Sequence, residues 1–143
     1  NIFCMLKIPN TEKKIINKQC RTIDIFPTIL DLAKISKEST HELQGESLIS
    51  FLENPNEEDR DVFVETGGLY GPWPSPDKHN VFCIKSNGKK LIYNDTPKTW
   101  EFYDLKSDPE ELNNIYDENL EIIHLYKKKL FYYLKNNEIK LNF

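Results

Sequence analysis

The strongest constraint on the fold is an Asn-Gly pair between two runs of strand-forming residues. Asn87 and Gly88 separate residues 81–86 from residues 89–93. A two-residue turn of type I′ needs positive φ at both central positions, and Asn and Gly adopt this conformation at the lowest cost. The pattern therefore predicts an antiparallel hairpin. Similar runs at 62–65 and 100–105 predict two further strands.

A long amphipathic helix is predicted over residues 119–136, after these strands. Apolar residues recur there at spacings of three and four, and they are Leu120, Ile123, Tyr126, Leu130 and Leu134. The spacing places them on one helical face, which we expect to pack on the sheet. Binding of this face to a partner helix or to a membrane surface is the alternative.

Three shorter helix signals lie elsewhere in the chain. Residues 24–33 carry Asp24 as an N-cap, Pro27 in the first turn and a wide apolar face. Residues 47–52 predict a second, shorter helix. Asp108 followed by Pro109 is typical of a helix N-terminus and predicts a third.

The apolar run at residues 2–6 suits a strand that is buried on both faces of a parallel sheet. This strand and the helix at 24–33 both need apolar neighbours, which the first part of the chain does not supply. The polar run at 53–60 favours a boundary between residues 1–55 and 56–143. We therefore expect the isolated chain to dimerise, swap or be disordered in its first part.

Charge and composition exclude several classes of function. The chain has 143 residues and a net charge of -4, and its only arginines are Arg21 and Arg60, whereas a nucleic-acid-binding module usually shows a basic face. No apolar run approaches the roughly 20 residues that span a bilayer. We therefore expect neither nucleic acid nor a membrane as a partner. Because it begins at Asn1 and not at a methionine, we interpret the chain as a fragment or a processed form.

The familiar catalytic motifs are missing from the sequence. It contains no HExxH, GxSxG, Walker loop or GxGxxG, and His41, His79 and His124 do not stand at metal-ligand spacing. A formal glycosylation sequon begins at Asn94, with Pro97 directly after it. The three cysteines are predicted to be small buried or half-buried groups, and they are Cys4, Cys20 and Cys83.

Three stretches of sequence carry a resemblance to a known family. Residues 23–33 read Ile-Asp-Ile-Phe-Pro-Thr-Ile-Leu-Asp-Leu-Ala, and residues 43–48 read Leu-Gln-Gly-Glu-Ser-Leu. Residues 90–93 read Lys-Leu-Ile-Tyr, and residues 100–114 read Trp-Glu-Phe-Tyr-Asp-Leu-Lys-Ser-Asp-Pro-Glu-Glu-Leu-Asn-Asn. In this order they resemble the C-terminal part of the sulfatase family, within the alkaline phosphatase-like superfamily. Lys34 departs from the pattern, because the family usually has Gly after the first helix.

The resemblance implies a fold of class α/β to α+β. Residues 1–55 would be the C-terminal end of a sulfatase-type catalytic α/β domain, made of a strand and helices. Residues 56–143 would form a C-terminal subdomain, with a small antiparallel sheet packed against a long C-terminal helix.

The resemblance also implies a chemistry, the hydrolysis of sulfate esters by a formylglycine nucleophile beside calcium or another divalent cation. In the family, formylglycine is made from the first residue of a Cys/Ser-x-Pro-x-Arg motif, which this sequence lacks. The family's metal and sulfate ligands precede the region that this chain resembles. We therefore assign no catalytic and no metal-binding residue to this chain, and we expect it to be inactive alone and to serve as a structural buttress.

A Gly- and Pro-rich loop at 66–80 is the expected point of contact with substrate in the intact enzyme. Tyr70, Trp73, Lys78 and His79 combine aromatic surface for a sugar or aryl ring with positive charge for an anionic ester. Long loops in compact domains are often functional. The loop would then form part of the substrate-pocket rim. The alternative is a solvated connection in which Trp73 packs on the hairpin.

The expected partners are the missing N-terminal catalytic domain and, in the intact enzyme, a sulfated small molecule or glycan. Two other interpretations are left open. The chain could be a non-catalytic accessory or interaction domain. It could also be the tail of a phosphate or phosphonate ester hydrolase of the same superfamily, because the C-terminal signature does not report the transferred group. The sequence ahead of Asn1 distinguishes these interpretations.

Overall fold

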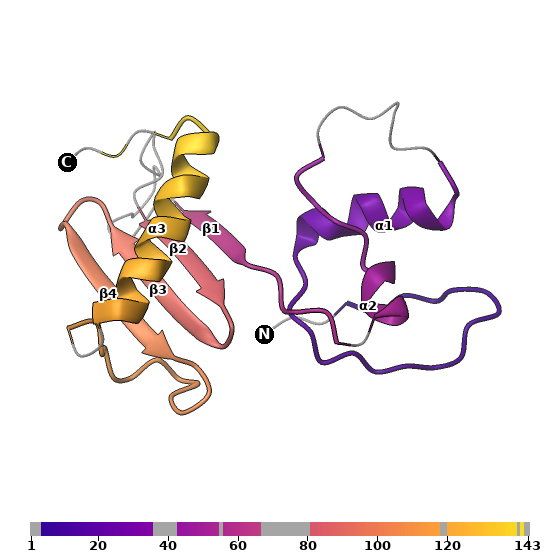
Figure 1. The fold of residues 1–143 in the computed structure, drawn as a ribbon, viewed down its shortest axis with the longest axis horizontal. Helices are drawn as coiled ribbons and strands as arrows, with labels where there is room; N and C mark the ends of the chain where they lie inside the picture. The colour runs from indigo at the N-terminus through magenta and orange to yellow at the C-terminus, as the bar shows by residue number, and fades with distance from the viewer. Residues whose placement is uncertain are drawn as a thin grey trace, which may run out of the picture. The chain divides into compact units, whose positions relative to one another are not determined.

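The computed structural model describes residues 4–35, 43–54, 56–66, 81–117, 120–139 and 141. The chain forms two compact units, Asn1–Glu57 and Glu58–Phe143. In the first unit, a 3-10 helix η1 (Thr22–Asp24) leads directly into α1 (Ile25–Leu32), and α2 (Ile49–Glu53) follows. The second unit contains the strands β1 (Val62–Thr66), β2 (Val81–Ser86), β3 (Lys89–Asn94) and β4 (Thr99–Asp104), and then the helix α3 (Leu120–Asn136) (Figure 1).

The four strands form one antiparallel sheet in the order β1-β2-β3-β4. Ser86 pairs with Lys89 across the turn between β2 and β3, and the φ angles of Asn87 and Gly88 are 46° and 74°. Positive φ at both positions is the signature of the type I′ turn. The predicted hairpin and both flanking strands are therefore confirmed.

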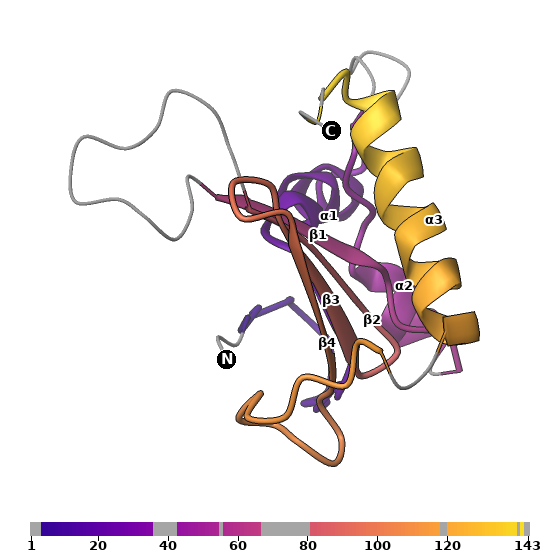
Figure 2. The ribbon, with the colours of Figure 1, turned by 90° about the vertical axis from the view of Figure 1, so that its left-hand side faces the viewer.

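The core of the second unit lies between one face of this sheet and α3, which runs along that face (Figure 2). The sheet contributes Ile84, Leu91 and Phe102, which are all completely buried. The helix contributes four buried side chains, which are Ile123, Tyr126, Leu130 and Leu134. Full burial of a Leu or Phe side chain stabilises a fold by about 1.5–3 kcal/mol. The predicted packing of this helical stripe on the sheet is confirmed, and the second unit is an α+β structure.

The helix that Asp108 and Pro109 predict does not form. The two carboxylate oxygens of Asp108 accept hydrogen bonds from the backbone amides of Leu112, at 3.1 Å, and Asn113, at 2.9 Å. Glu111, which lies between Asp108 and Leu112, has a φ of 58°, and this left-handed conformation ends any helical turn. The N-cap residue therefore starts a turn, but its side chain then satisfies the amides of an irregular loop.

The residues after this loop bind the edge of β4. The side-chain oxygen of Asn114 accepts a hydrogen bond from the backbone amide of Phe102 at 3.0 Å. The amide of Ile115 donates to the carbonyl of Phe102 at 2.9 Å. These contacts cover part of an otherwise open sheet edge. Tertiary pairing with the edge thus outweighs the local helix signal.

The first unit differs from its sequence-based expectation at its start. Residues 4–6 form no strand, and Met5 is 83% exposed. A strand that is buried on both faces needs neighbouring strands, and none is found in the described part of this unit. The helix predicted at 24–33 is confirmed as α1, and the short helix at 47–52 corresponds to α2. None of the described helices is long and apolar enough to cross a membrane.

Candidate interaction site

The residues predicted to contact substrate, Tyr70, Trp73, Lys78 and His79, lie outside the described residues. The structure does bring together a different set of groups, in the first unit. This set comprises a cluster of buried polar contacts around Asp24 and a hollow lined by residues 4–20 and the start of α2.

The Asp24 cluster joins η1 and α1 to residues 45–48. Asp24 is completely buried, and its carboxylate accepts hydrogen bonds from Nη2 of Arg21 at 2.8 Å and from the backbone amide of Glu46 at 3.0 Å. It also accepts from the amide of Arg21 at 3.0 Å, so the side chain caps η1 and not α1. Asp24 is the N-cap residue of α1 by position, as predicted, but its side chain makes no capping hydrogen bond to that helix, because the chain enters α1 through a 3-10 turn.

Thr28 and Gly45 complete this cluster. The hydroxyl of Thr28 donates to the carbonyl of Asp24 at 2.6 Å and accepts from the amide of Leu48 at 2.9 Å. A Cβ added to Gly45 would lie 2.0 Å from the carbonyl oxygen of Ile23, so only glycine fits there. The two motifs at 23–33 and 43–48 are thus parts of a single hydrogen-bonded structure.

The electrostatics of this cluster favour the ionised form of Asp24. Burial opposes ionisation, but hydrogen bonds from the Arg21 guanidinium and from the amides of Glu46 and Arg21 outweigh it. The pKa of Asp24 therefore lies below its usual value. Glu46 adds a second contact to the guanidinium, at 3.2 Å from Nη2 of Arg21.

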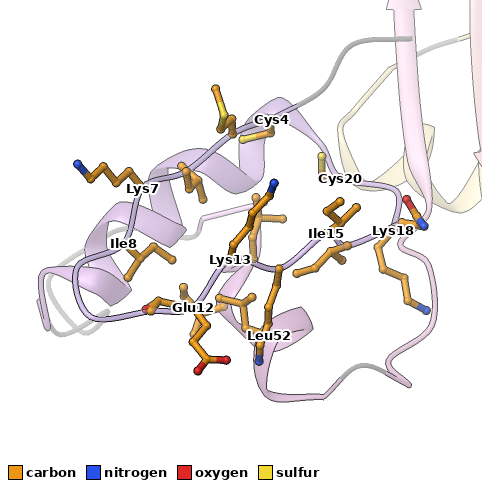
Figure 3. Close-up of a pocket in the computed structure, with 17 residues that line it drawn as sticks. Cys4, Lys7, Ile8, Glu12, Lys13, Ile15, Lys18, Cys20 and Leu52 are labelled. Atoms are coloured by element: carbon orange, nitrogen blue, oxygen red, sulfur yellow. The ribbon is translucent and has the colours of Figure 1, made fainter.

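The hollow has a volume of about 740 Å³ (Figure 3). Most of its lining comes from residues 4–20, and the rest comes from Leu48, Ile49 and Leu52. The lining is largely apolar and carries four lysines, which are Lys7, Lys13, Lys14 and Lys18. Figure 3 shows Cys4 and Cys20 among the same lining residues.

Large apolar side chains are exposed around this unit. Ile15 is 80% exposed, and Ile25, Phe26 and Ile29 of α1 are also exposed. The wide apolar face predicted for this helix is therefore present but largely uncovered. Contiguous exposed apolar surface of this kind marks a site of interaction. The surface contrasts with the second unit, where the apolar stripe of α3 is buried against the sheet.

The cysteines differ from the prediction that all three are buried or half-buried. Cys83 is buried in β2, and burial raises the pKa of its thiol to about 11. Cys4 and Cys20 are exposed, and none of the three is in a disulfide. The prediction is wrong for these two because residues 4–20, which carry them, form no helix or strand that could bury them.

A cluster of Ser86, Asp61 and Lys129 in the second unit resembles a nucleophile with neighbouring charged groups. Ser86 is only 1% exposed, and its hydroxyl donates a hydrogen bond to Asp61. The ammonium of Lys129 lies 2.9 Å from the Asp61 carboxylate and donates to Oγ of Ser86 at 3.3 Å. Tyr126 donates to the carbonyl of Ser86 at 2.6 Å. These contacts fasten α3 to β2 and leave no access for a substrate.

The sequon at Asn94 is not available for glycosylation in the folded chain. Asn94 is 2% exposed, and its side-chain nitrogen donates to Oε1 of Glu101 at 2.7 Å and to Oγ1 of Thr99 at 3.2 Å. Among the described residues, no group of three or more His, Cys, Asp or Glu side chains is placed to hold a metal ion. The described side chains therefore do not fit the cation that the sulfatase resemblance implies. The sequence also lacks the Cys/Ser-x-Pro-x-Arg motif from which formylglycine is made, so neither group is assigned to this chain.

Comparison with known proteins identifies the family. The chain matches the family described as N-sulphoglucosamine sulphohydrolase, C-terminal, over residues 2–137. A curated relative, the N-acetylglucosamine-6-O-sulfatase of Bacteroides thetaiotaomicron, is 37% identical over 99 residues. The match covers 66% of this chain but only 17% of the relative.

Two solved structures extend this comparison. One, in complex with its substrate D-glucosamine-2-N,6-O-disulfate, is 29% identical with a TM-score of 0.55, and the match covers 80% of this chain and 23% of that one. The phosphonate monoester hydrolase of Agrobacterium radiobacter is 25% identical with a TM-score of 0.56, covering 76% and 23%. The match to the family spans the motif regions, the sheet and all of α3. The chain therefore belongs to the N-sulphoglucosamine sulphohydrolase C-terminal family, that is, to the C-terminal region of sulfatases in the alkaline phosphatase-like superfamily.

Proposed function

We propose that this chain is the C-terminal portion of a sulfuric ester hydrolase, that it is inactive alone and that it buttresses a catalytic domain. The observation that carries the proposal is the family match over residues 2–137, combined with the short share, 17%, of the curated relative that the match covers. A nucleophile and a cation site would then lie in the remaining polypeptide, together with the sheet that residues 1–55 need.

The exposed surface of the first unit supports the buttress role. The outer face of α1 and the hollow expose apolar side chains that a catalytic α/β domain would cover. Residues 1–55 would then complete that domain, and residues 56–143 would be its C-terminal subdomain.

The substrate class that we propose is a sulfated amino sugar or glycan. Support comes from two relatives, of which one is an N-acetylglucosamine-6-O-sulfatase and the other is solved in complex with a disulfated glucosamine as its substrate. A phosphonate ester is the second candidate, because a phosphonate monoester hydrolase has a similar structure. An accessory domain without catalysis is the alternative from another class.

Two measurements test this proposal. The reading frame ahead of Asn1 should encode Cys/Ser-x-Pro-x-Arg, and the full-length protein should hydrolyse an aryl sulfate faster than an aryl phosphate or phosphonate. The 143-residue chain should hydrolyse none of them above background, because a remote group cannot replace a missing nucleophile. Turnover by the purified chain alone, or a full-length protein without sulfatase activity, would contradict the proposal.

We further propose that the loop at 66–80 forms part of the substrate-pocket rim. Replacing Trp73, Lys78 and His79 together by Ala in the full-length enzyme should raise KM and leave kcat within a few-fold. A contact at the rim binds substrate and transition state almost equally, so its loss affects binding more than chemistry. Steady-state kinetics with the aryl sulfate checks this, and an unchanged KM would remove the loop from the site.

A further inference from the structure

We propose that the hollow of the first unit receives an apolar segment flanked by carboxylates, which the catalytic portion of the same polypeptide supplies. This inference rests on the proposed function, since it names the chemistry of the surface on which this chain docks. It adds an electrostatic specificity that an apolar contact alone would not have.

The charge of the hollow is the first argument. Its lining contains four lysines and one glutamate, Glu12, although the chain as a whole has a net charge of -4. Lys7, Lys13 and Lys14 are exposed, and none of them has a carboxylate partner within the described residues. Lys18 donates to the backbone carbonyl of Glu57. The hollow thus has a concentration of uncompensated positive charge.

Several lysines of the second unit, by contrast, are paired with carboxylates of the same unit. Lys90 lies 2.6 Å from Glu111 and Lys129 lies 2.9 Å from Asp61, and Lys89 forms an ion pair with Asp104. In that unit these cations are neutralised by carboxylates of the same chain. The lysines of the hollow are left for a partner, and complementary charge across an interface gives both specificity and faster association.

The apolar lining is the third argument. Met5, Leu6, Ile15 and Ile16 line the hollow and are all exposed to solvent. Its volume of about 740 Å³ is several times the ~150 Å³ of a cavity that takes up benzene. The hollow therefore has room for several apolar side chains. An occupant that packs on the apolar lining and also pairs with the lysines has apolar side chains at its centre and Asp or Glu at its ends.

The thiols provide a direct readout of occupancy. Cys4 and Cys20 line the hollow and are exposed, whereas Cys83 is buried in the other unit. Each native protein is treated with iodoacetamide, and the alkylation of each cysteine is followed by peptide mass spectrometry. In the 143-residue chain, Cys4 and Cys20 should react much faster than Cys83. In the full-length protein, both should be protected at least tenfold relative to the isolated chain.

Charge reversal then tests the electrostatic part. In the full-length protein, Lys7→Glu, Lys13→Glu and Lys14→Glu together should abolish most of this protection, and the corresponding Lys→Gln variant should have an intermediate effect. The matched control reverses Lys106, Lys128 and Lys135, which are exposed lysines of the second unit. This control should leave the protection unchanged. In the wild type, raising NaCl from 50 to 500 mM should weaken the protection by screening.

Three outcomes would overturn the inference. Full alkylation of Cys4 and Cys20 in the full-length protein would show that the hollow is not filled. Protection that survives the charge reversal would show that the lysines play no part. Protection of the isolated chain by phosphatidylserine vesicles, lost in the same variant, would assign the hollow to a membrane surface. Failure of the proposed function is distinguishable, because it appears as a full-length protein without sulfatase activity, whatever its cysteine reactivity.

Discussion

At the scale of single residues, α1 ends in a left-handed residue that has a side chain, although glycine is the usual residue at such a position. The amide of Ile35 donates to the backbone carbonyl of Leu30 at 3.0 Å, and the amide of Lys34 donates to the backbone carbonyl of Asp31 at 3.0 Å. This is the Schellman pattern, in which the residue after the C-cap is left-handed and is usually glycine. Lys34 occupies that position with a φ of 55°.

Replacement of Lys34 by Gly should stabilise the first unit. A left-handed conformation costs a residue with a Cβ about 1–2 kcal/mol, and glycine avoids most of that cost. We expect a net gain of about 1 kcal/mol in the free energy of unfolding, measured by urea denaturation. Lys34→Ala is the matched control, because it removes the charge but keeps the Cβ. An equal gain for both variants would show that charge, and not backbone strain, is responsible.

Asp24→Asn should destabilise the chain in a pH-dependent way. The neutral amide removes the buried carboxylate from the guanidinium of Arg21 and leaves it only the exposed carboxylate of Glu46, which costs about 1–3 kcal/mol near neutral pH. Because the pKa of Asp24 is lowered by folding, its contribution is complete above the unfolded pKa of about 3.9. It is lost as the pH falls through the lower folded pKa.

Thermal unfolding of both proteins as a function of pH checks this prediction. The difference in midpoint between wild type and Asp24→Asn should be constant from pH 5 to 7. It should shrink as the solution becomes more acidic than pH 4. A difference that grew at low pH would mean that folding raises the pKa of Asp24.

The sequence could indicate the residues of the Asp24 cluster but not their roles. The two motifs at 23–33 and 43–48 were visible, yet their joining depends on a hydrogen bond between Asp24 and Glu46, 22 positions apart. The lysines of the hollow were not predicted as a site, because residues 13–18 carry no helix, strand or ligand motif. The run Lys-Lys-Ile-Ile-Asn-Lys at residues 13–18, in which a pair of isoleucines lies between lysines, was the available signal.

At the scale of elements, the β2–β3 hairpin was predictable because its turn is decided locally. Gly88→Ala tests this directly. The added Cβ would lie 2.8 Å from Cε of Lys106, but that side chain is flexible and can move. The remaining cost is the φ of 74°, so we expect a loss of about 1–2 kcal/mol in the free energy of unfolding.

A double variant separates these two contributions. If backbone strain dominates, Gly88→Ala should lower the free energy of unfolding by the same amount in the Lys106→Ala background as in the wild type. Asn87→Gly should change stability by less than about 0.5 kcal/mol, since glycine accepts the same φ. Recovery of stability in the double variant would instead identify the contact with Lys106 as the cause.

Other elements depend on contacts with residues distant in the sequence, and local sequence patterns predict these elements less well. The stripe of α3 was predictable because its period matches a helix and the sheet that covers it lies in the same chain. The helix expected at Asp108 failed because the following residues pair with the edge of β4. The strand expected at residues 2–6 requires a parallel sheet, which the described part of the chain does not contain.

At the scale of the whole molecule, the two units differ in how completely they bury their apolar side chains. The second unit has a closed core between its sheet and α3. The first unit has an open hollow and exposes much of α1. Local opening is easiest where few apolar contacts must be broken. The stability of the isolated chain should therefore be uneven along its sequence.

Hydrogen–deuterium exchange followed by mass spectrometry measures this difference. In the 143-residue chain, amides of residues 81–105 should exchange slowest, and amides of residues 4–33 should exchange faster by at least tenfold. Within the first unit, α1 should be slower than residues 4–20, because the Asp24 cluster fastens it to residues 45–48. In the full-length protein, exchange in residues 4–33 should slow towards that of the sheet. Fast exchange throughout 81–105 with slow exchange in 4–33 would reverse this order and contradict the dependence of the first unit on an external partner.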